Sequence, residues 1–347
     1  MQTLRYYVKR YWFFFPLYVI SLFIFIVGII RTNKALILKG DTVEFTSVVD
    51  VNTENEQHGS FSTIYVFSME KATVLQNWIA NGRVDIESYE ISKSTTHLTD
   101  IENYQAGKIQ YNSSIGNALV LAYSEASKKD SSIHLEYSFV GYDVTWYSAN
   151  SSFRIGDRIL GYYSSILGKE FRASDDSEEF KSILTSKDNK STDDYFIVNR
   201  KGQEINISNL KENSFTAYGI YEYNQIKSNP TFSVSSNLIG GPSGGLLQAL
   251  SIYNQLISED LTHGLKIAGT GTIKATGEVG AIGGIKEKIP TAFDDHIDVF
   301  FVCKANYEDA KIAYDALPNN DMKLVEIETF YDALDYLMEG YKNDFGN

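Results

Sequence analysis

The sequence has one cysteine, few prolines and no surplus of basic residues. Cys303 has no possible partner within the chain, so an intrachain disulfide is excluded, and its apolar surroundings, VFFVC, predict a buried residue rather than a nucleophile. The 44 acidic residues outnumber the 31 basic ones, and this net charge of −13 argues against nucleic-acid binding. The pattern G-x-x-x-x-G-K-[ST] is also missing, so no ATPase module is predicted.

What the chain does have is a long apolar run near its start. Residues Tyr11 to Ile30 carry no charge and are numerous enough to cross a hydrocarbon core of ~30 Å as a helix. No small-x-small cleavage site follows, so the run predicts an uncleaved anchor rather than a signal peptide. The short basic amino terminus is expected inside, with the bulk of the chain on the extracellular side.

The region after the anchor, residues 36–129, mixes strand and helix signals. Strands are predicted within 36–51, and a strand followed by a helix within 59–82. The polar stretch 84–114 is expected to form loops, and the apolar spacing of 114–129 predicts a helix. The role of this region is left open.

The next region, residues 130–212, resembles a PDZ domain of the bacterial protease type. The resemblance is carried by Tyr142–Val144, Phe153–Leu160 and Val198–Gly202, within the order strand, strand, helix, hairpin. Such domains capture a chain terminus as an added strand. A capturing loop is therefore implied near Val140, Gly141 and Tyr142, and the alternative is that these three residues simply begin a strand.

Four glycines then surround one hydroxyl in the segment NLIGGPSGGLLQAL. Leu246, Leu250 and Tyr253 have helical spacing, so Ser243 is expected where a turn enters a helix, and Pro242 suits that entry. Unpaired amides at a helix start can hold an oxyanion, and the glycines would let a substrate backbone approach. A helix-capping serine in a glycine turn would give the same pattern.

A nucleophilic serine needs a base, and histidines and lysines follow it. The pattern G-x-S-x-G would pair with His263 or His296, but Pro242 does not suit that strained turn. A lysine can act as base when burial lowers its pKa. The candidates are Lys266, Lys274, Lys286 and Lys288. The last two project about 200° apart on a helix, so one can be solvated while the other turns inward.

Three separated motifs, GPSGG, AGTGTI and GEVGAIGGIKEK, together resemble the proteolytic domain of Lon proteases over about Phe215 to Glu339. The resemblance implies a Ser–Lys dyad of Ser243 and Lys288, with Thr270 orienting the lysine. The turn amides from Pro242 to Gly244 would hold the oxyanion. Thr272 stands where the family often has Glu, and Pro290 comes early in the helix that follows Lys288, so the shape of the cleft is expected to differ.

The arrangement is similar to the membrane-anchored Lon-like serine proteases of Gram-positive bacteria. It implies an α+β protein divided into an anchor (1–35), a membrane-proximal region (36–129), a PDZ-like domain (130–212) and a Lon-like domain (213–347). The expected activity is ATP-independent cleavage of extracellular peptides or unstructured segments, such as secreted signalling peptides, without cofactor, metal or nucleic acid. Lon-type domains form rings, but no interface can be read from this sequence, so a homo-oligomer is left open. The alternatives are a non-catalytic, membrane-tethered peptide-binding module and a histidine-dependent esterase.

Overall fold

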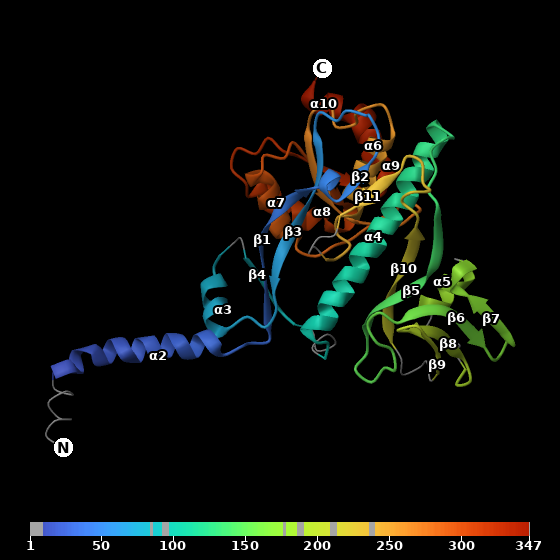
Figure 1. Cartoon of the computed structure of the whole chain (residues 1–347). Helices are drawn as coiled ribbons and strands as arrows, with labels where there is room; N and C mark the ends of the chain where they lie inside the picture. Colours follow the sequence, from blue (N-terminus) through green and yellow to red (C-terminus); the bar gives the residue numbers. More distant parts are fainter. Residues whose placement is uncertain are drawn as a thin grey trace.

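A computed structural model describes residues 10–83, 86–91, 97–175, 178–185, 191–208, 214–235 and 240–346. One apolar helix projects from a folded body that contains two six-stranded sheets (Figure 1). The fold is a mixture of helices and strands, as predicted.

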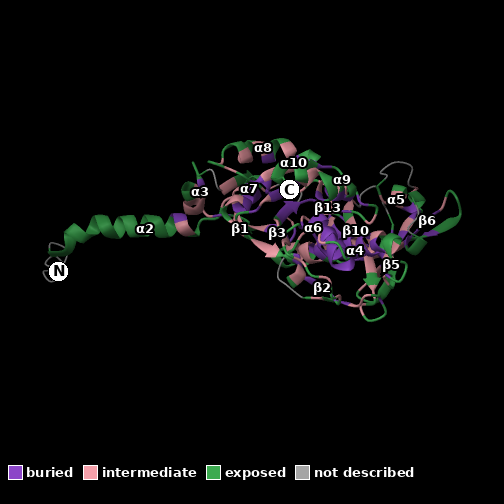
Figure 2. Cartoon of the chain, turned by 90° about the horizontal axis from the view of Figure 1, so that it is seen from above, coloured by how far each residue is buried: buried purple, intermediate pink, exposed green. Residues whose placement is uncertain are grey.

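The projecting element consists of the short helix η1 (Trp12–Phe14) and helix α2 (Phe15–Ile29). It is apolar around its whole circumference, and almost all of its residues are exposed (Figure 2). Among the described residues, one helix, spanning Trp12–Ile29, is long and apolar enough to cross a membrane. A signal sequence near an amino terminus would meet the same criterion. The predicted apolar helix is therefore present.

The first sheet joins segments from the two ends of the chain. Its order is β16-β15-β12-β3-β1-β4, in which β3, β12, β15 and β16 are parallel and β1 is antiparallel to both neighbours. The strands are β1 (Lys34–Glu44), β3 (Ser60–Met69), β4 (Ile86–Glu90), β12 (Lys266–Thr270), β15 (Val299–Cys303) and β16 (Lys323–Ile327). The domain boundaries predicted after residues 129 and 212 stay a prediction. This sheet, however, combines strands from the predicted membrane-proximal region with strands from the predicted C-terminal domain.

Helices cover both faces of this sheet, because its central strands are apolar on both sides. One core joins Phe61 and Phe301 to helices α4, α6 and α9, and the other joins Ile64 and Phe300 to helices α7 and α8. Their bounds are α4 (Asp100–Lys129), α6 (Gly245–Leu256), α7 (Ile285–Asp294), α8 (Tyr307–Asp315) and α9 (Phe330–Asp335). Cys303 is buried in the first core, as predicted.

The second sheet has the order β10-β5-β6-β8-β9, with β7 paired to β6. Its elements are β5 (Tyr137–Tyr147), β6 (Arg158–Ser164), β7 (Lys169–Arg172), α5 (Glu178–Thr185), β8 (Tyr195–Arg200), β9 (Gln203–Ile207) and β10 (Phe215–Tyr223). The sheet encloses its own aromatic core. The predicted hairpin turn is confirmed, since Lys201 and Gly202 both have positive φ between β8 and β9. Strand β10, expected in the C-terminal unit, pairs with β5 instead.

Helix α4 lies between the two sheets and shows where the sequence interpretation was wrong. Residues 84–114 were expected to loop, but β4 forms there and α4 begins at Asp100. The start of α4 is a capping box, in which the Thr99 hydroxyl accepts from the Glu102 amide and the Glu102 carboxylate accepts from the Thr99 amide. The first turns of α4 are polar, because its buried residues begin only at Ala106. The sequence there therefore lacks the apolar spacing from which a helix is predicted.

The remaining elements are short. They are η2 (Phe45–Ser47), β2 (Val49–Val51), α3 (Val74–Ala80), η3 (Ala173–Asp175), β11 (Phe232–Val234), β13 (Thr272–Ile273), β14 (Val279–Gly280), η4 (Lys304–Asn306), η5 (Tyr336–Gly340) and α10 (Tyr341–Phe345). Strands β13 and β14 form a short hairpin that leads from β12 towards α7.

Candidate active site

Ser243 lies in the turn that leads into α6, as the sequence predicted. Gly244 is the N-cap and the helix begins at Gly245. The carbonyl of Ser243 accepts a hydrogen bond from the Gly271 amide at 2.8 Å and one from the Thr270 hydroxyl at 3.0 Å. The turn is thereby fixed to the end of strand β12. Residues 237–239 of the quoted motif lie outside the described residues.

The glycines next to Ser243 serve the packing of the protein's own chain. A Cβ on Gly244 would lie 2.8 Å from the Thr63 hydroxyl, and one on Gly245 would lie 2.7 Å from Ile273. Gly271 has a φ of +154°, and a Cβ there would meet Val279 at 2.4 Å. Close approach of β3 and β13 to the start of α6 therefore requires these residues. The sequence interpretation had assigned the close approach to a substrate backbone.

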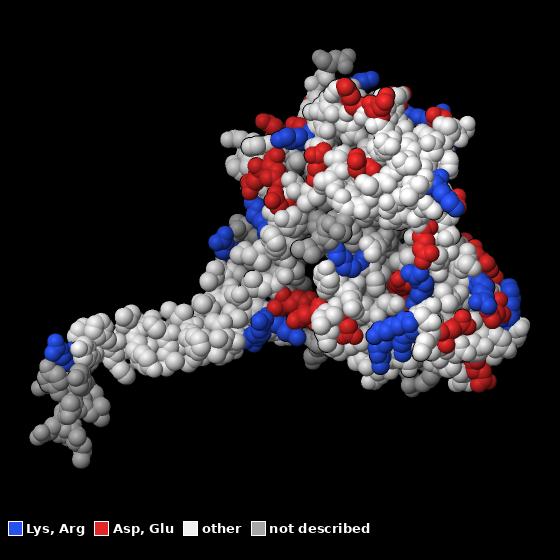
Figure 3. All heavy atoms as spheres, in the orientation of Figure 1, with Lys and Arg blue, Asp and Glu red and all other residues white. Residues whose placement is uncertain are grey.

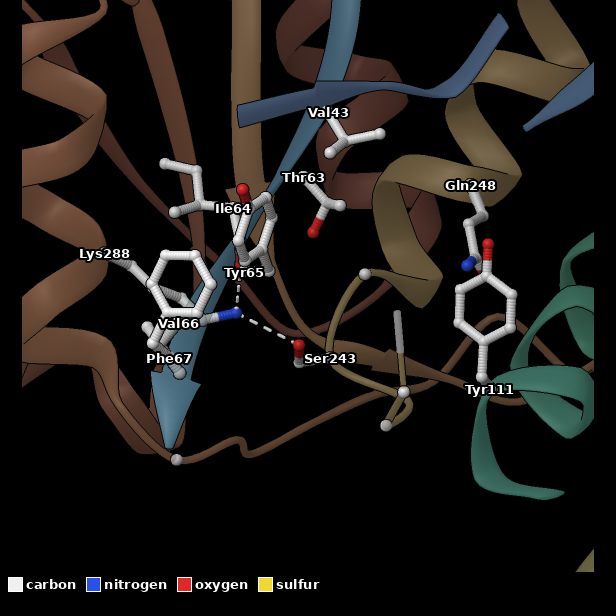
Figure 4. Close-up of a pocket in the computed structure, with 14 residues that line it drawn as sticks. Val43, Thr63, Ile64, Tyr65, Val66, Phe67, Tyr111, Ser243, Gln248 and Lys288 are labelled. Atoms are coloured by element: carbon white, nitrogen blue, oxygen red, sulfur yellow. Dashed lines mark hydrogen bonds between the residues drawn. The ribbon is translucent and has the colours of Figure 1, made fainter. Parts of the chain in front are cut away.

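Lys288 reaches the serine from α7 on the opposite face of the sheet. Its Nζ lies 3.0 Å from Ser243 Oγ and 2.7 Å from the Ile64 carbonyl oxygen (Figure 4). It also lies 3.4 Å from Thr270 Oγ1. Lys288 is 1% exposed and Thr270 is fully buried. The structure therefore brings together the three residues that the resemblance singled out.

The hydrogen-bond partners of Lys288 suit both of its protonation states: an ammonium can donate to all three, and a neutral amine can donate to two and accept from the third. An NH₂ group has two donors and one acceptor lone pair. The Ile64 carbonyl can only accept a hydrogen bond. The Thr270 hydroxyl donates its own hydrogen to the Ser243 carbonyl, so its oxygen can accept a hydrogen bond from Lys288. The lone pair of Lys288 is then left for the hydroxyl hydrogen of Ser243. In this state Lys288 is a base aimed at a nucleophile.

Burial makes that neutral state accessible. Desolvation lowers the pKa of Lys288 from its ordinary value to about 8. In the described part of the chain no carboxylate forms an ion pair with Lys288, and such a pair would favour the charged form. Lys286 meets the opposite environment, with its side chain 47% exposed and its Nζ 3.5 Å from Asp309. The predicted divergence of the two lysines on one helix is confirmed.

A cavity of about 550 Å³ opens beside the pair. It is lined by the end of β3, by Val43, by the serine turn, and by Tyr111 of α4 and Gln248 of α6 (Figure 4). Space for a peptide therefore exists next to Ser243.

Two lining residues were missed by the sequence interpretation. The hydroxyl of Thr63 is buried, and it has no hydrogen-bond partner among the described residues. Gln248 is 1% exposed, and its Oε1 accepts a hydrogen bond from Ser114 of α4. No motif surrounds Thr63 in the sequence. Gln248 lies in a helix that was predicted from its apolar residues alone, so its polar side chain was not considered. Only the assembled sheet places these side chains at the cavity.

Two backbone amides in the turn are available to a ligand. Gly241 donates to the Gly107 carbonyl and Gly245 to the Pro242 carbonyl, whereas within the described ranges the amides of Ser243 and Gly244 have no acceptor. They stand at the start of α6, where the helix dipole favours negative charge. Pro242 itself has no N–H. The turn can thus offer an oxyanion two donors, from Ser243 and Gly244.

The alternative bases lie elsewhere. Neither His263 nor His296 is among the residues lining the cavity. The His263 ring stacks on Tyr341 with centroids 3.8 Å apart, and its Nε2 lies 2.8 Å from the Leu337 carbonyl. The geometry gives no support to a histidine-dependent esterase.

The expected peptide-capturing loop is a strand. Val140, Gly141 and Tyr142 lie within β5, where Gly141 pairs with Ile220 of β10 and Tyr142 with Ile159 of β6. The Tyr142 ring also stacks on Phe180 of α5. The alternative that these residues belong to a strand therefore describes the structure. A role in holding a peptide terminus stays a prediction.

With this geometry in place, comparison with known proteins identifies one part of the chain. Residues 234–340 match the Lon protease (S16) C-terminal proteolytic domain. A Lon protease of Campylobacter concisus (strain 13826) is 35% identical over 94 residues, which cover 27% of this chain and 11% of that protein. A Lon protease of Mesomycoplasma hyopneumoniae (strain 232) is 31% identical over 99 residues, covering 28% and 11%.

The matched segment contains the serine and the lysine of the site, but it covers less than a third of the chain. Ser243, Thr270 and Lys288 all fall inside 234–340, and the finding supports a serine peptidase. Strand β10, which the resemblance had included, falls outside it. The chain spans about a ninth of the length of these relatives, so their whole activity does not transfer to it.

Proposed function

We propose that the protein is an ATP-independent serine endopeptidase that is anchored in a membrane and cuts extended peptide segments. One observation carries the proposal. The Nζ of buried Lys288 lies 3.0 Å from Ser243 Oγ, with its other two hydrogen bonds directed to Ile64 and Thr270. A structural serine at a helix start would need no such partner.

The chemistry follows from this arrangement. Neutral Lys288 takes the hydroxyl proton as Ser243 Oγ attacks a peptide carbonyl carbon, and the amides of Ser243 and Gly244 receive the oxyanion. Protonated Lys288 then gives the proton to the leaving amine as the C–N bond breaks. Water, deprotonated by Lys288, releases the acyl group and regenerates Ser243.

The edge of β3 favours an extended substrate. Strand β12 pairs with β3 only as far as Thr63, whereas β3 continues to Met69. Tyr65, Val66 and Phe67 lie beyond the last pair and line the cavity. An extended peptide can add to such an edge through backbone hydrogen bonds. A folded protein would not enter a cavity of about 550 Å³.

The exposed apolar helix supports the location. Helix α2 would cross the membrane with the folded body on the extracellular side, and secreted peptides or protein tails would be the substrates. The second sheet, with its separate core, would position substrate as a PDZ-like unit. Figure 3 shows acidic and basic side chains interspersed over the folded body, whereas α2 is bare of them.

The test uses the full chain in lipid vesicles with short unstructured peptides and no ATP. Cleavage followed by mass spectrometry should occur with the wild type and vanish in Ser243→Ala. A Ser258→Ala variant is a matched control, since Ser258 lies outside the cavity lining. Cleavage that persists in Ser243→Ala would refute the nucleophile. A folded wild type that cuts nothing would leave a tethered peptide-binding module as the function.

A further inference from the structure

Helix α3 turns its apolar side away from the folded body and towards helix α2. Trp78, Leu75 and Ile79 fall within an arc of about 100° on this helix, and Trp78 and Ile79 are 56% and 59% exposed. The opposite side faces the protein, where Ala80 is buried and Asn77 donates hydrogen bonds to backbone and side-chain oxygens. A helix on the surface of a soluble domain shows the reverse pattern.

The outward side of α3 adjoins the end of α2. The rings of Trp78 and Phe23 lie 6.0 Å apart, and a Cβ on Gly28 would be 3.9 Å from the Leu75 side chain. The Val74 amide donates to the Ile30 carbonyl at 2.9 Å. The apolar surfaces of the two helices are therefore continuous, and Figure 1 shows α3 beside the end of α2 that meets the folded body.

The position of Phe23 along α2 indicates how deep Trp78 would lie in a membrane. Phe23 precedes Ile29 by six residues, which corresponds to about 9 Å of helix. The apolar stretch Trp12–Ile29 is about 27 Å long, close to the ~30 Å of a hydrocarbon core. A side chain at the level of Phe23 would then lie about 9 Å below the surface, where interfacial helices insert by about 5–10 Å.

We propose that α3 is a membrane-contacting element whose Trp78–Leu75–Ile79 side lies in the phospholipid of the outer leaflet, next to α2. The proposal rests on the membrane anchoring put forward above. Trp suits this position, because its large ring is mostly apolar and Trp is enriched near membrane interfaces. The exposed Arg31 and Lys71 flank the junction and can reach phosphates. Two elements then hold the body on the bilayer.

The contact fixes the height of the catalytic pair. Strand β3 runs from Ile64, whose carbonyl binds Lys288, to Met69 near α3, a distance of about 17 Å. Along this path Phe67 and Met69 remain 57% and 36% exposed. The substrates of this site are therefore peptide segments that lie on or emerge from the bilayer surface, within a few nanometres of lipid.

The three tryptophans of the chain provide the test. Three full-length variants each keep one tryptophan and carry Phe at the other two positions, so that Trp12, Trp78 or Trp146 is the reporter. In phosphatidylcholine vesicles with brominated acyl chains, Trp12 and Trp78 should both lose emission and resist quenching by acrylamide. Trp146, which lies in β5, should be insensitive to the brominated lipid.

The outcomes separate this inference from the anchor and from the activity. Quenching of Trp12 without Trp78 would overturn the role of α3 and leave the anchor intact. Quenching of neither would overturn both. Cleavage by the Ser243 assay is read independently, so its failure would refute the peptidase and not the membrane contact.

A second variant tests the same surface without relying on one tryptophan. In the variant that keeps Trp78, Ile79→Asp should shift Trp78 emission to the red and increase its quenching by acrylamide. Ile312→Asp, an equally exposed isoleucine on α8, is the matched control and should change neither. An unaltered Trp78 spectrum in Ile79→Asp would overturn the proposal.

Discussion

The two sides of helix α7 present the same side chain to opposite surroundings. Lys286 is half-exposed and its Nζ lies 3.5 Å from Asp309, and such an exposed ion pair contributes little to stability. Lys288, two residues on, is 1% exposed and touches a carbonyl and two hydroxyls. The two lysines differ because of their positions in the fold: desolvation lowers the pKa of Lys288 to about 8, and among the described residues no ion-paired carboxylate raises it again.

The largest effect is expected from removing the buried amine. Lys288→Met should lower kcat by about 10³-fold or more, because nothing else within the described contacts of Ser243 can take its proton. Initial rates on an unstructured peptide provide the measurement. Activity within tenfold of the wild type would show that Lys288 is not the base.

The same substitution should strengthen the fold. A pKa depressed from 10.5 to about 8 costs the native state about 3 kcal/mol at pH below 8, where the unfolded lysine holds its proton freely. This cost shrinks between pH 8 and 10.5, since the unfolded state then binds more protons than the folded one. Urea unfolding of Lys288→Met and wild type at pH 7 and pH 10 measures the difference. An equal gain at both pH values would contradict this explanation.

A pH profile sharpens the comparison. Below about pH 8 Lys288 is protonated and cannot accept a proton, so kcat/KM should fall about tenfold per pH unit towards pH 6. Lys286→Met should keep this profile. A limb centred near pH 6.5 would point to a histidine in place of the lysine.

Thr270 supports only one of the two lysines. Thr270→Val removes the acceptor for Lys288 and the donor to the Ser243 carbonyl, so kcat should fall about tenfold with KM unchanged. Thr270→Ser retains the hydroxyl and should recover most of the rate. A larger loss in Thr270→Ser than in Thr270→Val would indicate that the methyl group, and hence packing, matters more than the hydrogen bonds.

The smallest effect is expected on the exposed side of the helix. Lys286→Met should change kcat/KM less than about twofold and stability by less than about 1 kcal/mol, because its pair with Asp309 is exposed and screened. Rates and urea midpoints should be compared at low and high salt. An essential Lys286 would mean that the two positions of the lysine pair have been exchanged.

The sequence was sufficient for the side chains that its own motifs contain. Ser243, Thr270 and Lys288 lie in three glycine-marked segments whose order was informative. Helical geometry predicted that Lys286 and Lys288 point in different directions, and the family resemblance chose Lys288 as the buried one. The hairpin after β8 was equally readable from its turn residues.

The rest of the site depends on long-range packing. The Ile64 carbonyl is a backbone group that any residue could supply, and Thr63 stands in a strand without a motif. Their roles arise because β3 lies beside β12, which apolar patterning cannot specify. The first half of α4 did carry a signal, the capping box at Thr99, but its polar composition concealed it.

The sheet that combines both ends of the chain has a consequence for timing. Lys288 Nζ and the Ile64 oxygen meet across 224 positions, and β3 gains its parallel neighbour only when β12 has been made. A chain that is synthesised from its amino terminus must therefore wait for its last third before the lysine is desolvated beside Ser243. A peptidase built in this way cannot cut its own unfinished chain, because Ser243 and Lys288 come together only after the whole chain has folded.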